Sequence, residues 1–303
     1  MITRDLARFT TLASSLAPDF GPATARAAFL VAPDGFSLAV QSAADNRYMA
    51  AAHAFDAEGA SRQHRDLHRA LSKVLPTVCL AGDPETPDAV FPNNVFATGA
   101  GRYVVGRMRH PVRQREATRA DIRGFFEYTL GYRAIDLSTQ PHPCELTGAL
   151  VIDRARGLGY AGISERCDED GARLMHEAFG LRATLLFDLA PDEYHTNVVL
   201  AVLAGRAVVI CPQGFADPGV VEAIASLYGP HVVRCTPGEH AAFVGNCIAL
   251  SAGSAWMSAR AGRALTVETR GALAAAGLRI ETVELDAIEA GGGSLRCCVG
   301  EIF

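Results

Sequence analysis

Apolar residues fall in short runs of strand length along the chain, separated by turns and by segments with helical periodicity. Residues 197–215 show this most clearly, because NVVLAVL and AVVI are two apolar runs joined by a tight turn at Ala204 and Gly205. A helix start follows, with Asp217 before Pro218, and the run HVVRC comes next. Short apolar runs bounded by turn residues predict strands, and Pro in a first helical turn is a start signal. This segment is therefore predicted to form a hairpin, a helix and a return strand.

The same order of elements occurs five times. The other four units are AAFLVAPDGFSLAV (27–40) with a helix at 61–74 and TVCLAG (77–82); VFATGAGRYVVGRM (95–108) with a helix at 119–130 and YRAIDLS; GALVIDRARGLGYAGIS (148–164) with a helix capped near Asp168 and ATLLFDL; and CIALSAGSAWMSARA (247–261) with a helix at 267–276 and LRIETVEL. Strands that alternate with single helices indicate an α/β protein. Hairpins within each unit favour mixed sheets over the all-parallel sheet of a doubly wound fold.

Five residues suited to chemistry recur at nearly the same interval. They are Asn94, Glu145, His195, Asn246 and Cys297, with gaps of 51, 50, 51 and 51 residues, and each precedes a strand-like run. A fixed period of this length is typical of a repeat architecture. A ring of five units would bring equivalent positions together at its centre. The period thus predicts one active site built from residues that lie far apart in sequence.

Length alone leaves open two average domains or one large domain for 303 residues. No linker rich in Pro, Gly or Ser divides the chain, so we expect a single domain over 1–303, with residues 1–25 as an extension or covering helix. The five units are expected to form five repeats of about 50 residues with pseudo-fivefold symmetry.

Composition and charge narrow the class of protein. The chain is 49% apolar and 20% charged, as in a globular protein with a substantial core, and its net charge is −5. This charge argues against binding to nucleic acid or to an anionic membrane. The N-terminus has no apolar segment of a signal peptide, and the longest apolar run, Val198 to Ala204, is strand length. We therefore expect a cytoplasmic protein, and a homo-oligomer is left open.

The cysteines and histidines indicate no metal site. The eight cysteines are scattered and form no CxxC pair, so most are expected to be buried reduced thiols. His64 and His68 lie four apart on a predicted helix, a spacing that can bind metal. No third ligand is near them, so an exposed helix face is the expected interpretation. Neither a metal nor a cofactor is predicted.

Several motifs together resemble those of the guanidine-modifying enzymes, the superfamily of arginine deiminase, dimethylargininase and amidinotransferase. They are PDAVFPNN (87–94), ELTG (145–148), SER (164–166), YHTN (194–197), GNC (245–247) and GGGSLRCC (291–298), and the resemblance covers about residues 28–303. It implies the five-bladed α/β propeller called a pentein, in agreement with the period. The FPNN form, AADN at 43–46 and the RC ending look most similar to the citrulline-utilisation hydrolase branch.

The resemblance implies a catalytic role for three of the periodic residues. Cys297 is expected to attack the central carbon of a guanidino group, with Arg296 or a cationic substrate favouring the thiolate. His195 would protonate the departing nitrogen and then activate water, and Glu145 would hold the substrate nitrogens. Cys298 is expected on the opposite face of the same strand, in a structural role.

Other matching positions are expected to bind the substrate. Asp88 suits a guanidinium or an α-amine, and Arg166, with Arg107 as a weaker candidate, suits the α-carboxylate. The remaining charges of the surrounding run RMRHPVRQREATR are expected on a solvated loop and helix face. Asn246, which precedes Cys247 in GNC, and Asn93 complete the predicted site.

Asn94 departs from the pattern of deiminases and dimethylargininases, which usually place an aspartate there. An asparagine offers a donor and an acceptor without charge, which fits a neutral ureido group such as that of citrulline. We therefore expect a cysteine-dependent hydrolase that acts on the guanidino or ureido carbon of a small arginine-derived amino acid, with citrulline cleavage to ornithine favoured. Alternatives are a dimethylarginine or arginine hydrolase giving citrulline, an amidinotransferase, and a non-catalytic binding propeller.

Overall fold

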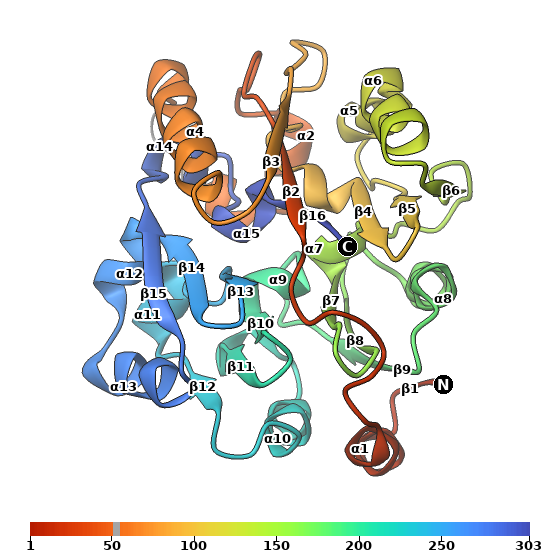
Figure 1. Ribbon diagram of the computed structural model, residues 1–303, viewed down its shortest axis with the longest axis vertical. Coiled ribbons are helices and arrows are strands. Elements are labelled where there is room, and N and C mark those ends of the chain that lie inside the picture. Colours follow the sequence, from red (N-terminus) through yellow and green to blue (C-terminus); the bar gives the residue numbers. More distant parts are fainter. Residues whose placement is uncertain (51–54) are drawn as a thin grey trace.

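The computed structural model describes residues 1–50 and 55–303 as five separate sheets with helices around them (Figure 1). In each sheet an antiparallel pair of strands is extended by a parallel third strand. The predicted α/β class with mixed sheets is confirmed. The strands are β16 (Gly300–Ile302), β2 (Ala27–Val31) and β3 (Thr77–Leu80); β4 (Phe96–Gly99), β5 (Arg102–Val105) and β6 (Arg133–Asp136); β7 (Leu150–Asp153), β8 (Leu158–Ile163) and β9 (Ala183–Asp188), with β1 (Ile2–Thr3) beside β9; β10 (Leu200–Leu203), β11 (Ala207–Ile210) and β12 (Val232–Arg234); and β13 (Ile248–Ser251), β14 (Ser254–Ser258) and β15 (Arg279–Val283).

One helical segment precedes each parallel third strand, as the pattern predicted. These segments are α4 (Ala57–Leu71), α6 (Ala120–Gly124) with the π-turn η3 (Phe125–Thr129), α8 (Glu169–Phe179), α10 (Pro218–Ser226) and α13 (Val267–Ala275). Side chains cap four of them: Asp56, Asp168, Asp217 and Thr266 each accept a backbone N–H in the first helical turn. Such caps satisfy amide groups that have no partner inside the helix, which fixes where each helix begins.

The predicted hairpin of the first unit is wrong. Residues 36–40 form no strand, and β16, from the other end of the chain, pairs antiparallel with β2 through Gly300 and Phe29. A Cβ on Gly300 would lie 2.0 Å from the Phe29 ring, so only glycine fits this close approach. The segment after β2 instead forms two short helices, α2 (Val40–Ala43) and α3 (Arg47–Ala50).

Short helical segments introduce the first strands and carry the periodic residues. Asn94 ends η1 (Pro92–Asn94), Glu145 precedes α7 (Leu146–Ala149), His195 precedes α9 (Thr196–Val199), Cys297 lies in α15 (Leu295–Cys298), and Asn246 lies two residues before β13. α7 contacts both η1 and α9, and α15 contacts η1. The interval of about 51 residues therefore places all five side chains at equivalent ends of the first strands.

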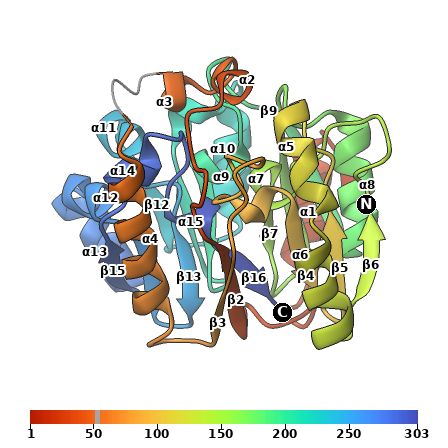
Figure 2. The ribbon, with the colours of Figure 1, turned by 90° about the horizontal axis from the view of Figure 1, so that it is seen from above.

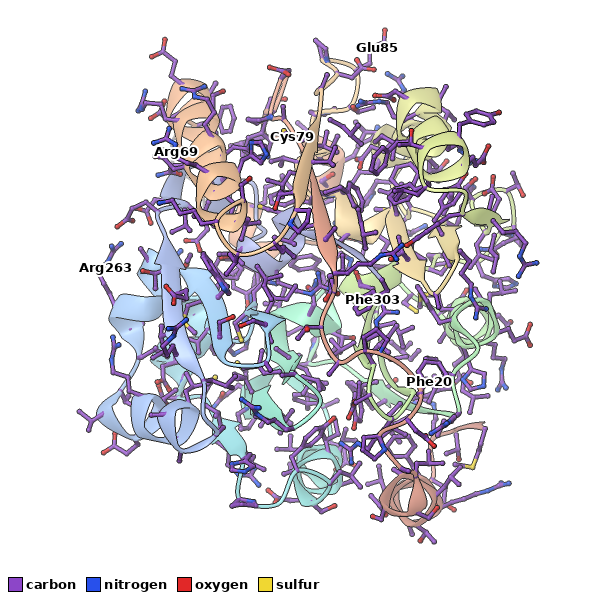
Figure 3. The ribbon with its side chains drawn as sticks, in the orientation of Figure 1. Phe20, Arg69, Cys79, Glu85, Arg263 and Phe303 are labelled. Atoms are coloured by element: carbon purple, nitrogen blue, oxygen red, sulfur yellow. The ribbon has the colours of Figure 1, made fainter. Side chains whose placement is uncertain are left out.

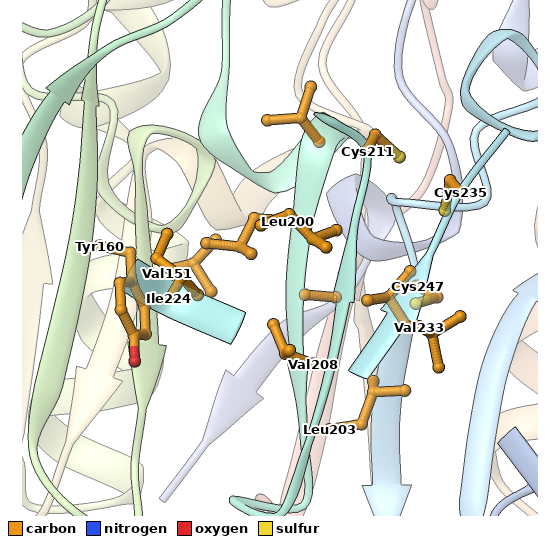
Figure 4. Packing of buried hydrophobic residues seen from close by; sticks show 14 of the residues in the cluster. Val151, Tyr160, Leu200, Leu203, Val208, Cys211, Ile224, Val233, Cys235 and Cys247 are labelled. Carbon is orange, nitrogen blue, oxygen red and sulfur yellow. The ribbon is translucent and has the colours of Figure 1, made fainter. Parts of the chain in front are cut away.

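The core lies between the sheets and the surrounding helices (Figure 4). Its largest cluster includes Leu200, Val208 and Ile224, from one strand pair and its helix. Residues 1–25 cover part of this core, because β1 pairs in parallel with β9 and α1 (Leu6–Ser15) packs on α10 and β9. The remaining short segments are α5 (Pro111–Gln114), η2 (Arg115–Thr118), η4 (Pro212–Gly214), α11 (Pro237–Ala241), α12 (Ala259–Ala264) and α14 (Asp286–Glu289).

One sequence interpretation of exposure is wrong and another is confirmed. His64 was expected on a solvated helix face but is buried on α4, and burial lowers the pKa of its imidazole to about 4. The expectation that most cysteines are buried reduced thiols is confirmed, because seven of the eight free thiols are buried and Cys79 is exposed. None of the helices in residues 1–50 and 55–303 combines the length and apolar character needed to cross a membrane.

Candidate active site

A cavity with about 300 Å³ of empty space lies beneath α2 and α3, and we call it the front cavity. Figure 2 shows α2 and α3 at one end of the molecule and the C-terminus at the opposite end. Four predicted site residues line the cavity, namely Asp88, Asn94, Arg166 and Cys297. Its other lining residues are Ser42, Asn46, Met49, Phe91, Arg113, Tyr194, Gly291 and Gly293.

Both Cys298 and Cys297 lie in the helical turn α15 and not on a strand. The prediction that Cys298 occupies the opposite face of a strand from Cys297 is therefore wrong. The backbone N–H of Cys297 donates to the Ser294 carbonyl at 3.0 Å. The glycine run is a packing requirement, because a Cβ on Gly293 would lie 2.8 Å from the Phe91 ring. Burial raises the pKa of the Cys297 thiol above its ordinary value, although its hydrogen bond with Asn246 acts in the opposite direction. The thiol form of Cys297 is therefore favoured over the thiolate at neutral pH.

Two asparagine side chains contact the Cys297 sulfur. Asn246 Nδ2 lies 3.2 Å from Sγ, and Sγ lies 3.7 Å from Asn197 Oδ1. Asn246 also donates to the Asn197 backbone carbonyl at 2.9 Å. An N–H donor beside sulfur stabilises a thiolate, so the amide of Asn246 favours ionisation once the thiol proton leaves.

His195 and Glu145 form a buried pair behind the cavity lining. His195 Nε2 lies 2.8 Å from Glu145 Oε2, and both residues are at most 1% exposed. Burial lowers the pKa of His195, and the contact with Glu145 only partly offsets this effect. Burial alone would raise the pKa of Glu145, but Arg166 and His195 hold it well below its ordinary value.

These charges fix the tautomer of the imidazole. An ionised Glu145 only accepts hydrogen bonds, so Nε2 of His195 carries the proton and Nδ1 of the neutral ring keeps its lone pair. Nδ1 is buried and has no hydrogen-bond partner among the described residues. A Cβ on Gly148 would lie 2.8 Å from Nδ1 and 2.5 Å from Oδ1 of Asn94. Nδ1 is therefore a free base on the side of the ring that faces Asn94, and Asn94 lines the cavity.

Arg166 joins this pair to the segment that covers the cavity. Its Nη1 donates to Glu145 Oε2 at 3.2 Å, and its Nε donates to Asp45 Oδ2 at 2.8 Å. Nη2 also pairs with Asp45 and donates to the Ser42 carbonyl at 3.1 Å. The guanidinium of Arg166 is thus bound on both edges by carboxylates.

Unpartnered buried polar atoms concentrate at this site. They include Asp88 Oδ1, both amide atoms of Asn93, Asn94 Oδ1, His195 Nδ1, Asn197 Nδ2 and Asn246 Oδ1. Most buried polar groups in proteins are hydrogen-bonded, so a cluster of free ones indicates a place where a ligand or water completes the bonding. Burial raises the pKa of the Asp88 carboxyl, which accepts a hydrogen bond from Ser42.

Three predicted binding residues do not line the front cavity: Arg107, Asn93 and Asn246, of which Asn246 instead contacts the Cys297 sulfur. Arg107 donates to the Ser138 carbonyl at 2.9 Å, away from Cys297. Asn93 lies behind Asn94, where its backbone carbonyl accepts from Thr147 Oγ1 at 3.0 Å. Arg113, which was not predicted as a binding residue, lines the cavity in addition to Arg166.

Arg113 belongs to the run whose charges were expected in solvent. Arg113 and Glu116 are 3% and 2% exposed, and their side chains pair at 2.8 and 2.9 Å. That expectation is wrong for both residues, since mutual neutralisation lets two charges be buried together. Their spacing of three residues on a helix was a usable signal.

Other residues at the site also escaped the sequence analysis. Asn197 follows His195 within the YHTN motif, yet its contact with Cys297 joins residues 100 positions apart and has no local signal. Asp45 and Ser42 reach the site from α2 and the turn that follows it, where no hydrophobic pattern marks them. Within residues 1–50 and 55–303, no group of three His, Cys, Asp or Glu side chains is arranged to hold a metal ion.

Comparison with known proteins places this geometry in a family. Residues 32–303 match the family model described as N,N dimethylarginine dimethylhydrolase, eukaryotic. The chain is also 28% identical over 261 residues to the N(G),N(G)-dimethylarginine dimethylaminohydrolase of Mycobacterium tuberculosis, covering 85% of this chain and 80% of that protein.

Two solved structures share the fold at low identity. The N-terminal domain of ArgZ, an arginine dihydrolase from the ornithine–ammonia cycle in cyanobacteria, superposes with a TM-score of 0.79, at 20% identity over 91% of this chain and 97% of that one. A dimethylarginine dimethylaminohydrolase variant bound to S-methyl-L-thiocitrulline gives a TM-score of 0.71, at 18% identity over 92% and 100%. The resemblance seen in the sequence motifs is confirmed, and the chain belongs to the N,N-dimethylarginine dimethylhydrolase family of guanidine-modifying hydrolases.

Proposed function

We propose that this protein is a cysteine-dependent hydrolase that cleaves the C–N bond at the ureido carbon of a citrulline-type amino acid and releases ornithine. Family membership supports a hydrolase that acts on arginine-derived guanidino compounds. The observation that carries the finer choice is Asn94, an uncharged amide that lines the same cavity as the Cys297 thiol. A neutral ureido group needs a donor and an acceptor there and no counter-charge.

The first half of the reaction uses the free nitrogen of His195. The thiol proton moves to Nδ1 of His195, and the sulfur of Cys297 attacks the ureido carbon to form a tetrahedral adduct. His195 then gives that proton to the δ-nitrogen of the substrate, and the C–N bond breaks. Ornithine leaves, and a carbamoyl group stays on the sulfur.

Hydrolysis of the thioester-like intermediate completes the cycle. His195 Nδ1 takes a proton from a water molecule, and the resulting hydroxide attacks the carbamoyl carbon. The C–S bond breaks, Cys297 regains its proton from His195, and carbamic acid is released. Glu145 acts in both halves by holding His195 in the tautomer that leaves Nδ1 free.

The ends of the substrate have candidate partners in the cavity. Arg166 suits the α-carboxylate, which would take the place now held by Asp45. Asp88 has an unpartnered oxygen and suits the α-amine. Arg113 is less available than Arg166, because the side chain of its carboxylate partner Glu116 is 3% exposed, whereas that of Asp45 on Arg166 is 18% exposed and can be displaced.

Rival activities remain within the same chemistry. The matched family and the mycobacterial relative are dimethylarginine hydrolases, which supports hydrolysis of a methylarginine to citrulline as a rival activity. The cyanobacterial structure is that of an arginine dihydrolase, which supports hydrolysis of arginine to ornithine as another. An amidinotransferase would need an acceptor amine in addition, and a binding propeller would use no nucleophile.

The proposal includes the finer architecture. The five mixed sheets are assigned as the five blades of a pentein propeller with pseudo-fivefold symmetry, within a single domain over 1–303 and with residues 1–25 as its extension. A cytoplasmic location and a homo-oligomer stay predictions from sequence, and so does the absence of a cofactor.

Product analysis by mass spectrometry tests the function. The purified protein is incubated separately with citrulline, arginine, both dimethylarginines and N-succinylarginine, each with and without glycine as an acceptor. Ornithine from citrulline, lost in Cys297→Ala, is the expected result. Citrulline formed from arginine or a methylarginine would instead support the rival hydrolases, and turnover by Cys297→Ala would reject the covalent mechanism.

A further inference from the structure

A second cavity, which we call the rear cavity, lies on the other side of Asn197 from Cys297. It contains about 490 Å³ of empty space and is lined by residues of β7, β10, β13 and β16, together with Asn197 and Arg296. Asn197 forms part of its wall, and Oδ1 of the same side chain faces the sulfur at 3.7 Å. Cys297 lines only the front cavity and Asn197 only the rear cavity, and the two linings share no residue.

The charges of the side chains that line the rear cavity do not sum to zero. Arg154, Arg296 and Glu301 line it, and Arg296 pairs with Glu301 at 2.8 Å. Arg154 makes no ion pair within the part of the chain that the structure describes. Its Nη1 donates to the Thr98 carbonyl at 3.0 Å. The lining therefore carries one uncompensated positive charge.

Arg154, which carries this charge, lies against an aromatic ring. Its guanidinium lies over the Phe303 ring, labelled in Figure 3, with Cζ 4.2 Å from the ring centre. Burial lowers the pKa of Arg154 to about 10, so the group is still a cation at neutral pH. Arg154 is half-buried, and a partly desolvated cation without a carboxylate partner would be stabilised by a bound anion.

Asn197 supplies a second and independent polar group. Its side chain is 1% exposed, and Nδ2 has no hydrogen-bond partner among the described residues. Because Oδ1 is directed at the sulfur, Nδ2 is the atom left for the rear cavity. A cation and a neutral N–H donor on the walls of one cavity form a receptor for a small anion.

We propose that the rear cavity binds a small monovalent oxyanion of the carboxylate or bicarbonate type, with Arg154 as its counter-ion and the amide of Asn197 as a donor. One uncompensated charge selects a monoanion over a phosphate dianion. The site is distinct from the place where the amino acid substrate binds, and it goes beyond the proposed hydrolase activity.

Titration with ¹³C-formate, followed by its transverse relaxation in NMR at constant ionic strength, tests the site on the full chain. Formate relaxation should be enhanced in a saturable way, and unlabelled bicarbonate should reverse the enhancement. Arg154→Met should weaken binding at least tenfold, and Arg154→Lys should retain it. Arg65→Met, which removes an exposed cation of equal charge, is the matched control and should bind as the unaltered protein does.

Two results would overturn the site: no saturable enhancement in the unaltered protein, or equal binding by Arg154→Met and the control. A measurement without variants covers the case in which Arg154→Met does not fold. Crystals of the unaltered protein soaked in bromide should give an anomalous peak beside the Arg154 guanidinium, and peaks confined to the outer surface would reject the proposal. Neither measurement involves turnover, so failure here leaves the proposed hydrolase activity untouched.

Discussion

The carboxylate of Asp45 pairs with two nitrogens of the Arg166 guanidinium, in the geometry by which an arginine holds a carboxylate ligand. The two residues are 121 positions apart, and Asp45 reaches Arg166 from the segment that covers the front cavity. In the proposed reaction the α-carboxylate of the substrate needs the same edge of Arg166. Asp45 therefore competes with the α-carboxylate of the substrate for binding to Arg166.

Replacing Asp45 by asparagine should remove this competition. We expect Asp45→Asn to lower KM about threefold to tenfold, equivalent to about 0.7–1.4 kcal/mol, with a small change in kcat. Steady-state kinetics with the substrate found by product analysis would measure the effect. Asp192→Asn, which removes an exposed carboxylate near Arg47, is the control and should leave KM unchanged. A rise in KM for Asp45→Asn would show that Asp45 helps to close the site over the substrate.

His195 is expected to be needed twice, once for the leaving nitrogen and once for water. His195→Asn should lower kcat by about 10²–10⁴, the range for loss of an acid–base group. When the first step still proceeds, the carbamoyl or amidino group should accumulate on Cys297. Mass spectrometry of the quenched protein would detect the added mass, and a substrate-dependent adduct on any other residue would contradict the assignment of the nucleophile.

The rate at which the buried Cys297 thiol is alkylated should depend on pH. Because burial raises the pKa of Cys297, its thiolate fraction should be small at pH 7 and increase as pH rises through and beyond the ordinary cysteine range of about 8.5. The rate of iodoacetamide labelling at Cys297, read by tandem mass spectrometry, should follow this increase. Asn246→Ala should shift the curve further upward in pH, since the thiolate loses a hydrogen-bond donor. A labelling rate already at its plateau at pH 7 would be incompatible with the buried thiol.

Glu145 should contribute to stability in a pH-dependent way. Its folded-state pKa lies below the unfolded value of about 4.3, so its contribution is complete above that value and declines as pH falls below it. Glu145→Gln should destabilise the fold by about 3 kcal/mol at pH 7, because it breaks a buried charged network. Urea unfolding at pH 7 and pH 3 should show a smaller difference between variant and parent at the lower pH. Glu222→Gln, which removes an exposed partner of Arg234, should cost less than about 1 kcal/mol at either pH.

Gly148 should be required for activity more than for folding. An alanine Cβ would lie 2.5 Å from Asn94 Oδ1 and 2.8 Å from the His195 ring, so Gly148→Ala must displace one of these side chains. We expect kcat/KM to fall at least tenfold while far-UV circular dichroism stays close to that of the parent. Gly271→Ala, at a helical position with no atom near its Cβ, is the control and should keep full activity. Equal activities of the two variants would remove the link between the packing at Gly148 and catalysis.

The sequence was informative where chemistry and local pattern coincide. Helix starts at Asp168 and Pro218 follow from local capping rules, and the periodic placement of Glu145 and His195 follows from the repeat. Burial of Arg113 and Glu116 was missed, because a pair of charges looks solvated until its partners are known. Asp45 lies in the AADN segment, but its contact with Arg166 was missed, because it depends on how a segment without hydrophobic pattern folds back over the cavity.

Strand pairing was the other limit. The apolar run of β2 predicts a strand, but no local signal says that its antiparallel partner is β16 from the opposite end of the chain. A hydrophobic pattern specifies which face of a strand is buried and leaves the choice of neighbour to tertiary packing.

This pairing of β16 with β2 has a consequence during protein synthesis. A nascent chain that has been synthesised as far as His195 already contains Glu145, His195 and β2. The antiparallel partner of β2, which is β16, is not yet made. Cys297 lies in the turn that leads directly into β16, so the thiol is positioned only when β16 pairs with β2. Contacts between such distant segments form late. The thiol should therefore reach its final position only after β16 has paired with β2.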